Sequence, residues 1–346
     1  MQPGLSRLAA GQRQLTPNRP GDAILAAKLA VLSKHPRQAL CCLADWDAGP
    51  ALAALADQAA LEHPQAWTQT AAPAASGDLA ARAGAYSARL LGWTLRAGAV
   101  EQAQQTQGAK GIEGTTGSGD PAIGACLRSL PAEWRLAGLL CLSFAEDFAV
   151  IDSAPGAAGR IPWLAVCLPS HWAPEDKVGK RFTDVHAPVA DSDLLVRAAA
   201  HLPQLVCGPQ RWQRFVWTLT PSPSLDGHPR RQPRVRWPAD GSAADIAALA
   251  WLRIEHQTFI PIVERQQAVF TIKVELLRLV DVLADPRVGA ATGRALHAAL
   301  ASMSDAVLVY RGLDLARDRL LDFLRDELRD GLHAGLHDRL DNRAGP

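Results

Sequence analysis

His186 lies in an unusual setting for a histidine, between Val185 and Ala187 and directly before Pro188. A neutral imidazole in an apolar segment braced by a proline has the features of an axial ligand to haem iron, which requires one ring nitrogen held rigidly over a flat hydrophobic slot. The same setting also suits a core histidine whose hydrogen bonds are satisfied within the protein. Residue chemistry alone leaves both interpretations open.

The predicted strand AWLRIEHQTF carries further candidate groups. Arg253 and Glu255 share one of its faces, with Gln257 in line. They can bind haem propionates or order oxygen in a pocket, or they can form an ordinary ion pair on the outer face of a sheet, which contributes little stability. His256 points to the opposite face, which we expect to be the core side.

Two other spacings are relevant to chemistry. Arg214 and Trp217 lie three residues apart in the predicted strand QRFVWTLTPS, so their side chains point to opposite faces. Cys167 and His171 are four residues apart, a spacing found in some metal sites, but no second ligand pair accompanies them and zinc requires three or four ligands. We therefore expect a core thiol beside a loop histidine.

Several familiar motifs are absent from the sequence. It contains no Walker loop, G-x-G-x-x-G, G-x-S-x-G, H-E-x-x-H or paired C-x-x-C, which argues against the usual nucleotide, hydrolase and zinc sites. It also lacks C-x-x-C-H, the motif for covalent haem attachment. The six cysteines are scattered, mostly in apolar runs, which is typical of reduced, buried thiols.

Charge and hydropathy limit the partners that we expect. The chain of 346 residues has 36 basic and 35 acidic side chains and a formal net charge of +1. Because no net field attracts a polyanion, we expect no nucleic-acid partner. The N-terminus lacks an apolar core of signal-peptide length, and no run approaches the roughly 20 apolar residues of a membrane span. We predict a cytoplasmic protein without a membrane anchor.

The elements that must position the candidate residues change character along the chain. Residues 1–22 are predicted to form a poorly tethered, flexible arm. Residues 23–100 are predicted to be a helical cap of three helices, of which the first is broken near Pro36 and the third ends near Gly98. Residues 101–122 have no apolar period and are predicted to be a flexible linker.

The pattern of apolar and polar residues changes in residues 123–285. Four or five segments alternate apolar and polar residues, mostly without a helix between neighbours, and this pattern favours an antiparallel sheet. Residues 286–346 are predicted to be a C-terminal helical region, whose last helix carries a leucine at every fourth position from Leu320 to Leu340. The predicted fold class is α+β: an antiparallel sheet domain with an N-terminal helical cap and C-terminal helices.

Taken in order, several segments resemble the haem-dependent oxidative N-demethylase family over roughly residues 25–325. AEDFAVI resembles its Q-E-D-hydrophobic segment, and LAVCLPSHWAPEDKVGKRFTDVHAPV resembles its C-hydrophobic-P-S-x-W, K-hydrophobic-G and I-H-x-P-V patterns. RFVW is similar to the family's R-x-N-W, and LRIEHQTF to its L-R-x-E-x-Q-T-L. AVFTIKV and LVYRGL match the last two landmarks. No single segment is specific, whereas the ordered set is.

The resemblance implies a PAS-like core over residues 123–285 that holds a b-type haem non-covalently. It also implies an oxygenase that uses O2 to remove a methyl group from an amine or another small nitrogen-containing metabolite. Electrons would come from NADPH through a flavin and iron–sulfur reductase component, so a reductase partner is expected. Whether the chain forms a homo-oligomer is left open.

The resemblance further implies roles for individual residues. His186 becomes the favoured ligand of the haem iron, with His171 and His256 as alternatives. The other cofactor-binding candidates are Lys177 and Arg253, which can neutralise propionates, and Trp172. The candidates for the distal pocket and its hydrogen-bond network are Arg214, Trp217, Glu255 and His256.

The chain departs from the family pattern at two places. Val216 replaces the Asn of R-x-N-W, and Ile260 and Pro261 replace a basic pair, with His256 where Arg is common. Losing these cations changes which ligand, propionate or partner charge fits nearby, so the cofactor can be shared with the family while the substrate differs. Two alternatives remain: a haem-binding PAS-like sensor and a non-catalytic subunit that has lost haem.

Overall fold

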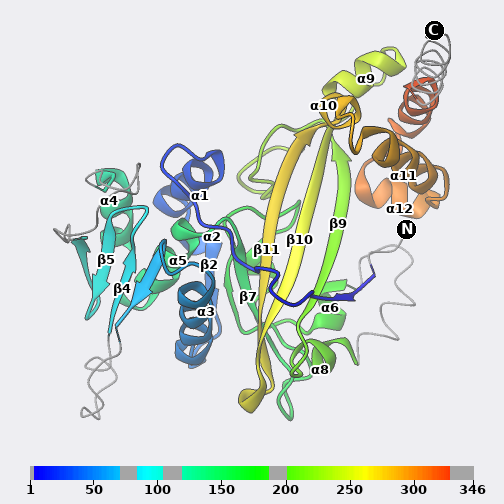
Figure 1. The fold of residues 1–346 in the computed structure, drawn as a ribbon. Coiled ribbons are helices and arrows are strands. Elements are labelled where there is room, and N and C mark those ends of the chain that lie inside the picture. Colours follow the sequence, from blue (N-terminus) through cyan, green and yellow to red (C-terminus); the bar gives the residue numbers. More distant parts are fainter. Residues whose placement is uncertain (1–3, 71–83, 104–118, 187–200, 328–346) are drawn as a thin grey trace, which may run out of the picture.

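The computed structural model describes residues 4–70, 84–103, 119–186 and 201–327 and confirms the α+β class. Figure 1 shows a small sheet on one side, a group of helices next to it, and a larger sheet of long strands beyond them. Further helices lie at one end of the larger sheet. Within the described ranges, no helix has both the length and the apolar character needed to cross a bilayer.

The larger sheet has seven strands in the order β1-β9-β10-β11-β7-β8-β2, and all neighbouring pairs are antiparallel. Its strands are β1 (Ser6–Arg7), β2 (Leu40–Cys42), β7 (Asp147–Asp152), β8 (Trp163–Ala165), β9 (Trp212–Thr220), β10 (Trp251–Ile262) and β11 (Gln267–Arg278). The strands predicted from alternation are therefore confirmed. Numbered in chain order, the five strands from β7 to β11 have the spatial order 2-1-5-4-3.

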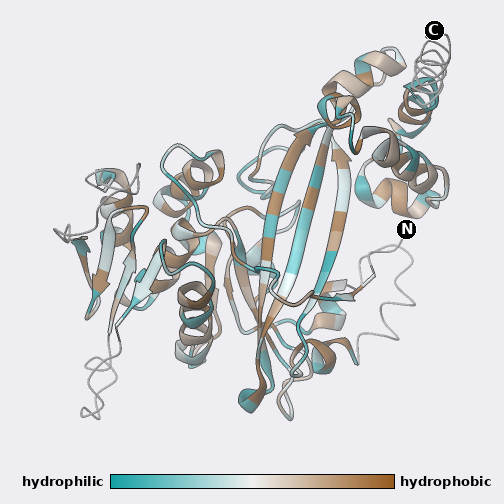
Figure 2. Cartoon of the chain, viewed as in Figure 1, coloured by the Kyte–Doolittle hydropathy of each residue, from teal (hydrophilic) through white to brown (hydrophobic). Residues whose placement is uncertain are grey.

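Successive residues of β9, β10 and β11 point to opposite faces of the larger sheet, and Figure 2 shows the resulting bands of hydropathy along these strands. One face, which we call the polar face, bears Arg214, Arg253, Glu255 and Gln257. The opposite face, which we call the strapped face, bears Phe215, Trp217, His256 and Thr258. The register fixes this division, because Gln257 lies opposite Arg214 and His256 lies opposite Phe215.

His256 is half-buried, and neither face of the sheet is by itself the core side to which we expected it to point. Arg253 and Gln257 on the polar face are only 3% and 5% exposed, whereas Phe215, the neighbour of His256 on the strapped face, is 51% exposed. Both faces carry apolar clusters at their ends. Alternation with period two separates the faces but does not tell which one is buried at a given position.

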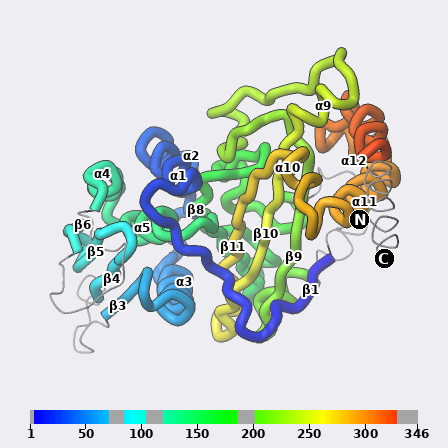
Figure 3. The backbone as a smooth tube through the Cα atoms, turned by 45° about the horizontal axis from the view of Figure 1, so that its top comes forward, coloured from blue at the N-terminus to red at the C-terminus, as the bar shows by residue number. Residues whose placement is uncertain are grey.

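The N-terminal segment crosses the strapped face, as Figure 3 shows. Gln14 Nε2 donates to Thr258 Oγ1 and to the carbonyl of Phe259, both at 2.9 Å. The backbone N–H of Thr16 donates to Glu146 at 2.8 Å, and β1 pairs with β9 at the sheet edge. The flexible arm expected over residues 1–22 is therefore wrong for residues 6–18, because buried polar groups of the sheet and helices bind the backbone of this strap.

The region expected to be a helical cap contains both helices and strands. The helices here and in the next segment are α1 (Ala23–Lys34), α2 (Pro36–Ala39), α3 (Gly49–Glu62), α4 (Pro121–Ser129) and α5 (Arg135–Ser143). The break before Pro36 and the helix before Pro64 are confirmed. The third helix is wrong: the small sheet consists of β3 (Trp67–Gln69), β4 (Ala85–Ala88), β5 (Trp93–Arg96) and β6 (Ala99–Gln102).

Helices cover one end of the strapped face through a second apolar cluster. They are α9 (Ala243–Leu249), α10 (Leu279–Ala284), α11 (Gly289–Ala301), α12 (Asp305–Arg311) and a helix over residues 317–327. Leu320 and Leu324 are fully buried in this cluster, so the first leucines of the predicted stripe pack on the protein itself. The later leucines, from Leu328 on, lie outside the described residues. The boundaries predicted at 22, 100, 122 and 285 stay predictions.

Candidate functional site

Three side chains on the polar face form a hydrogen-bonded row, which we call the polar row. Arg214 Nε donates to Gln257 Oε1 over 2.5 Å, and Gln257 Nε2 donates to Glu255 Oε2 over 2.6 Å. The Gln257 amide thus joins a cation to a carboxylate, and its orientation is fixed because only its oxygen can accept from arginine. Burial lowers the pKa of Arg214 from its usual value, and the nearby charge of Glu255 opposes this. The sequence placed Gln257 in line with Glu255 but did not predict this bridge.

Arg253 lies on the same face but is fully engaged by the protein. Its Nε donates to Ser170 Oγ at 2.7 Å. Its Nη1 and Nη2 donate, at 2.9–3.3 Å, to four backbone carbonyl oxygens in two loops: Leu168, Pro169, Ser224 and Leu225. Arg253 therefore clamps two loops over one end of the polar face, and each of its guanidinium nitrogens already has a protein acceptor.

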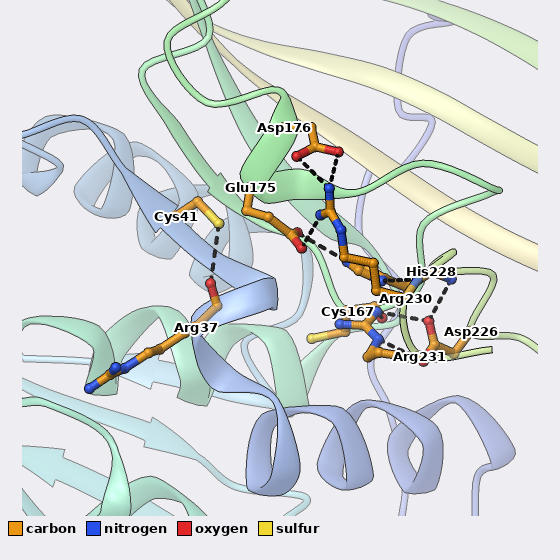
Figure 4. Close-up of polar contacts among 9 residues, drawn as sticks. All are labelled: Arg37, Cys41, Cys167, Glu175, Asp176, Asp226, His228, Arg230 and Arg231. Carbon is orange, nitrogen blue, oxygen red and sulfur yellow. Dashed lines mark hydrogen bonds and ion pairs between the residues drawn. The ribbon is translucent and has the colours of Figure 1, made fainter.

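A second set of polar contacts fixes the same two loops and was not predicted from the sequence (Figure 4). The buried His228 contacts Glu175 through Nε2 at 3.0 Å, while its Nδ1 accepts from the backbone N–H of Arg230 at 3.1 Å. Arg231 pairs with Asp226 at 2.8 Å and donates to the carbonyl of Cys167.

This network also sets the charge state of one carboxyl group. Burial raises the pKa of Glu175, but hydrogen bonds from His228 and Arg230 outweigh it and leave that pKa below its usual value. An ionised Glu175 therefore holds residues 226–231 against the 3-10 helix Pro174–Asp176. Both nitrogens of the His228 ring are occupied, so the network is a loop anchor.

Two of the four predicted distal-pocket residues lie on the strapped face. Trp217 packs among the C-terminal helices, where the Arg311 guanidinium lies 5.6 Å from its ring and also donates to its carbonyl at 2.6 Å. His256 stacks on Phe215, with ring centroids 4.4 Å apart and planes 5° from parallel. The sheet itself therefore separates Trp217 and His256 from Arg214 and Glu255.

The helix α6 (Phe182–His186) brings the segment of His186 to the polar face. Phe182 and Val185 pack in apolar clusters that share Phe270, a residue on this face. The side chain of His186, with residues 187–200, lies outside the described part of the structure. Trp172 packs in the same cluster as Val185.

Lys177 follows the 3-10 helix Pro174–Asp176 and is half-buried. Burial and the charge of Lys180 lower its pKa. No hydrogen bond or ion pair engages its ammonium group among the described residues. The structure thus leaves Lys177 as an unpaired cation close to the anchored loops.

Cys167 and His171 do not come together as a ligand pair. Cys167 is fully buried, and a hydrogen bond with Cys141 and burial raise its pKa well above the usual value. His171 lies on the loop that Arg253 clamps, and the residue is exposed. Partial desolvation of its ring is the main cause that lowers its pKa, and the charges of Arg253 and Arg234 lower it further. The expectation of a core thiol beside a loop histidine is therefore confirmed.

A buried charged cluster under the strap was also missed from the sequence. Lys28 is 0% exposed, pairs with Asp147 at 3.0 Å and donates to the carbonyls of Phe144 and Glu146. Burial raises the pKa of Glu146 to about 7, against the hydrogen bond from Thr16 and the charge of Lys28. The sequence around Lys28 predicts only a helix, and the buried ion pair is set by tertiary packing.

Comparison with known proteins gives one family. The family model described as "Haem-dependent oxidative N-demethylase, alpha subunit-like" matches residues 131–321. The match runs from before β7 through β11 and into the C-terminal helices, so it contains the whole polar face. No curated protein gives a significant match to this chain.

Proposed function

Because the chain belongs to the haem-dependent oxidative N-demethylase, alpha subunit-like family, we propose that it is a haem-dependent oxygenase that demethylates an amine or another small nitrogen-containing metabolite. We also propose that electrons reach the haem from NADPH through a flavin and iron–sulfur reductase. We further propose partner subunits, because the family description contains the words "alpha subunit". The observation that carries it is the polar row, in which the buried amide of Gln257 joins the partly buried Arg214 and Glu255 on one sheet face within the matched region. The 2-1-5-4-3 strand order supports a PAS-like core.

The residues of the polar face fit a haem in two respects. The β11 partners of Gln257 and Glu255 are Ile272 and Val274, which give the row an apolar border. Arg214 supplies a cation with donors that the described protein does not use. When bound, haem supplies the activation of O2.

For the iron ligand we propose His186, because α6 packs on the polar face whereas His256 lies on the opposite one. His171 is the alternative on the polar face. Trp172 and Lys177 stay candidates for contacts at the rim of the cofactor. Arg253, whose donors are all engaged, acts in this proposal by holding the loops in place.

The polar row gives the substrate a place to bind. Glu255 Oε1 has no hydrogen-bond partner among the described residues, so it can accept from the N–H of an amine. Gln257 holds Glu255 through its other oxygen and so orients it. The buried side chains of Ile272 and Val274 border the row and reduce the contact of its hydrogen bonds with water. Trp217 and His256 act from the strapped face and do not touch the substrate in this proposal.

The test is the absorbance of the purified protein titrated with haemin. We expect a Soret band in the wild type that His186→Ala abolishes and that His256→Ala leaves unchanged, with His171→Ala deciding the alternative ligand. With NADPH and a suitable reductase, formaldehyde release from a methylated amine separates an enzyme from a sensor. A protein that stays colourless with haemin contradicts the proposal.

A further inference from the structure

Arg214 is a cation without a direct ion-pair partner in the described ranges, although the charge of Glu255, beyond Gln257, acts on it and partly offsets the lowering of its pKa by burial. Its Nε is bonded to the neutral amide of Gln257, but Nη1 and Nη2 have no hydrogen bond, and no carboxylate lies within ion-pairing distance in the described ranges. Burial disfavours its charged form. The Arg214 side chain is partly buried, and a partly desolvated guanidinium with unused donors is stabilised by an anion that accepts from them.

The other arginine of this face makes the contrast clear. Arg253 donates from all three of its nitrogens to five protein acceptors. Both side chains arise from neighbouring strands of one rigid sheet, at fixed places in its register. All the guanidinium nitrogens of Arg253 therefore hold the two loops, whereas the Nη1 and Nη2 groups of Arg214 remain available as donors to a ligand.

We propose that Arg214 is the anion-binding residue of a carboxylate subsite, and that the ligand is a carboxylate borne by a molecule that lies along the polar row. This inference rests on the proposed function and specifies its binding site. The planar fork matches the two oxygens of a carboxylate. Glu255, held at the other end of the row by Gln257, disfavours a dianion such as phosphate by repulsion and can accept an N–H from the same or a neighbouring ligand.

Two sources can supply this carboxylate. One is the substrate, which would then be an N-methylated amino acid, with its carboxylate on Arg214 and its nitrogen toward Glu255. The other is a propionate of haem. The shared chemistry is a single carboxylate in a low-dielectric site, where a charge-assisted pair changes affinity by about tenfold or more.

The experiment compares ligands on the wild-type protein, so that it does not depend on a variant that folds. In one arm, calorimetry on the haem-free chain compares N-methylglycine with dimethylamine, which lacks the carboxylate. In the other, absorbance titration compares haemin with haemin dimethyl ester, whose propionates are blocked. Arg214→Gln and Arg214→Lys follow in each arm, with Arg287→Gln as control, because Arg287 is an exposed arginine whose side chain is 86% accessible.

Binding of N-methylglycine at least about tenfold tighter than dimethylamine, lost in Arg214→Gln, identifies a substrate carboxylate. A comparable preference for haemin over its dimethyl ester, lost in the same variant, identifies a propionate. Arg214→Lys should restore only part of either preference, because it keeps the charge without the fork. The proposal is overturned if neither carboxylate is preferred. A chain that binds N-methylglycine but no haem contradicts the proposed function and leaves the carboxylate subsite standing.

Discussion

The polar face and the strapped face of the larger sheet come from the same three strands but use their polar residues differently. On the strapped face, Thr258 accepts from Gln14 of the strap, and the backbone of Trp217 accepts from Arg311. On the polar face, the row of Arg214, Gln257 and Glu255 has open donors at one end and an open acceptor at the other. This difference is the basis of our proposal that the polar row binds a ligand, whereas the polar residues of the strapped face are used by the fold itself.

Within the polar face the same contrast separates its two arginines, and it has the largest expected effect. Arg253→Ala removes the donor from five acceptors, four of them backbone carbonyls, and should lower the free energy of unfolding by about 3–5 kcal/mol. Arg214→Ala removes one described hydrogen bond and should change that free energy by about 1 kcal/mol or less. Urea unfolding followed by tryptophan fluorescence measures both. Equal losses would mean that Arg214 is also a structural clamp.

The strap should respond to pH through Glu146. Its carboxyl titrates near 4.5 when the chain is unfolded and near 7 when folded. The folded state therefore binds the proton more tightly, and the free energy of unfolding falls as pH rises from 4.5 to 7, by up to about 3 kcal/mol. In Glu146→Gln this fall should be absent, so the variant should gain stability relative to the wild type between pH 5 and pH 8.

Thermal unfolding of both proteins across this pH range measures the effect. Glu62→Gln is the matched control, since Glu62 also accepts strap N–H groups, from Gln14 and Leu15. A Glu146→Gln profile that keeps the wild-type fall would show that other groups cause it.

A small effect is also expected for the exposed middle of the strapped face. His256→Ala removes a stacked contact with Phe215 and a hydrogen bond to Gln213, and should cost about 0.5–1.5 kcal/mol. It should leave ligand binding on the polar face unchanged, whereas Glu255→Gln should weaken amine binding. Urea unfolding and the ligand titrations check the two statements. Loss of haem binding in His256→Ala would contradict the different roles that we assign to the two faces, because it would place the cofactor on the strapped face.

The sequence predicted the long strands well because their pattern is local. Alternating residues in β9, β10 and β11 must point to opposite faces whatever the rest of the chain does. That is why the shared face of Arg253, Glu255 and Gln257, and the separation of Arg214 from Trp217, were readable in advance. The ordered family segments added the family, which the family model confirms.

Local patterns failed where a distant partner decided the structure. The segment around Trp93 has enough alanine and leucine to favour a helix, but it forms strands because Trp67 and Tyr86 offer partners for a small sheet. The strap has no apolar period that would predict a helix or a strand, and its order comes from Glu62, Glu146 and Thr258, which lie far along the chain.

By itself, the sequence determined the two faces of the central strands, the α+β class and the family, because period and ordered motifs are properties of neighbouring residues. Only the tertiary structure decided that every guanidinium nitrogen of Arg253 has a protein acceptor, whereas Nη1 and Nη2 of Arg214 have none among the described residues. Both are arginines on predicted strands, and nothing local distinguishes them. Their difference arises from loops at residues 168–170 and 224–225 that fold over one of them and supply its acceptors.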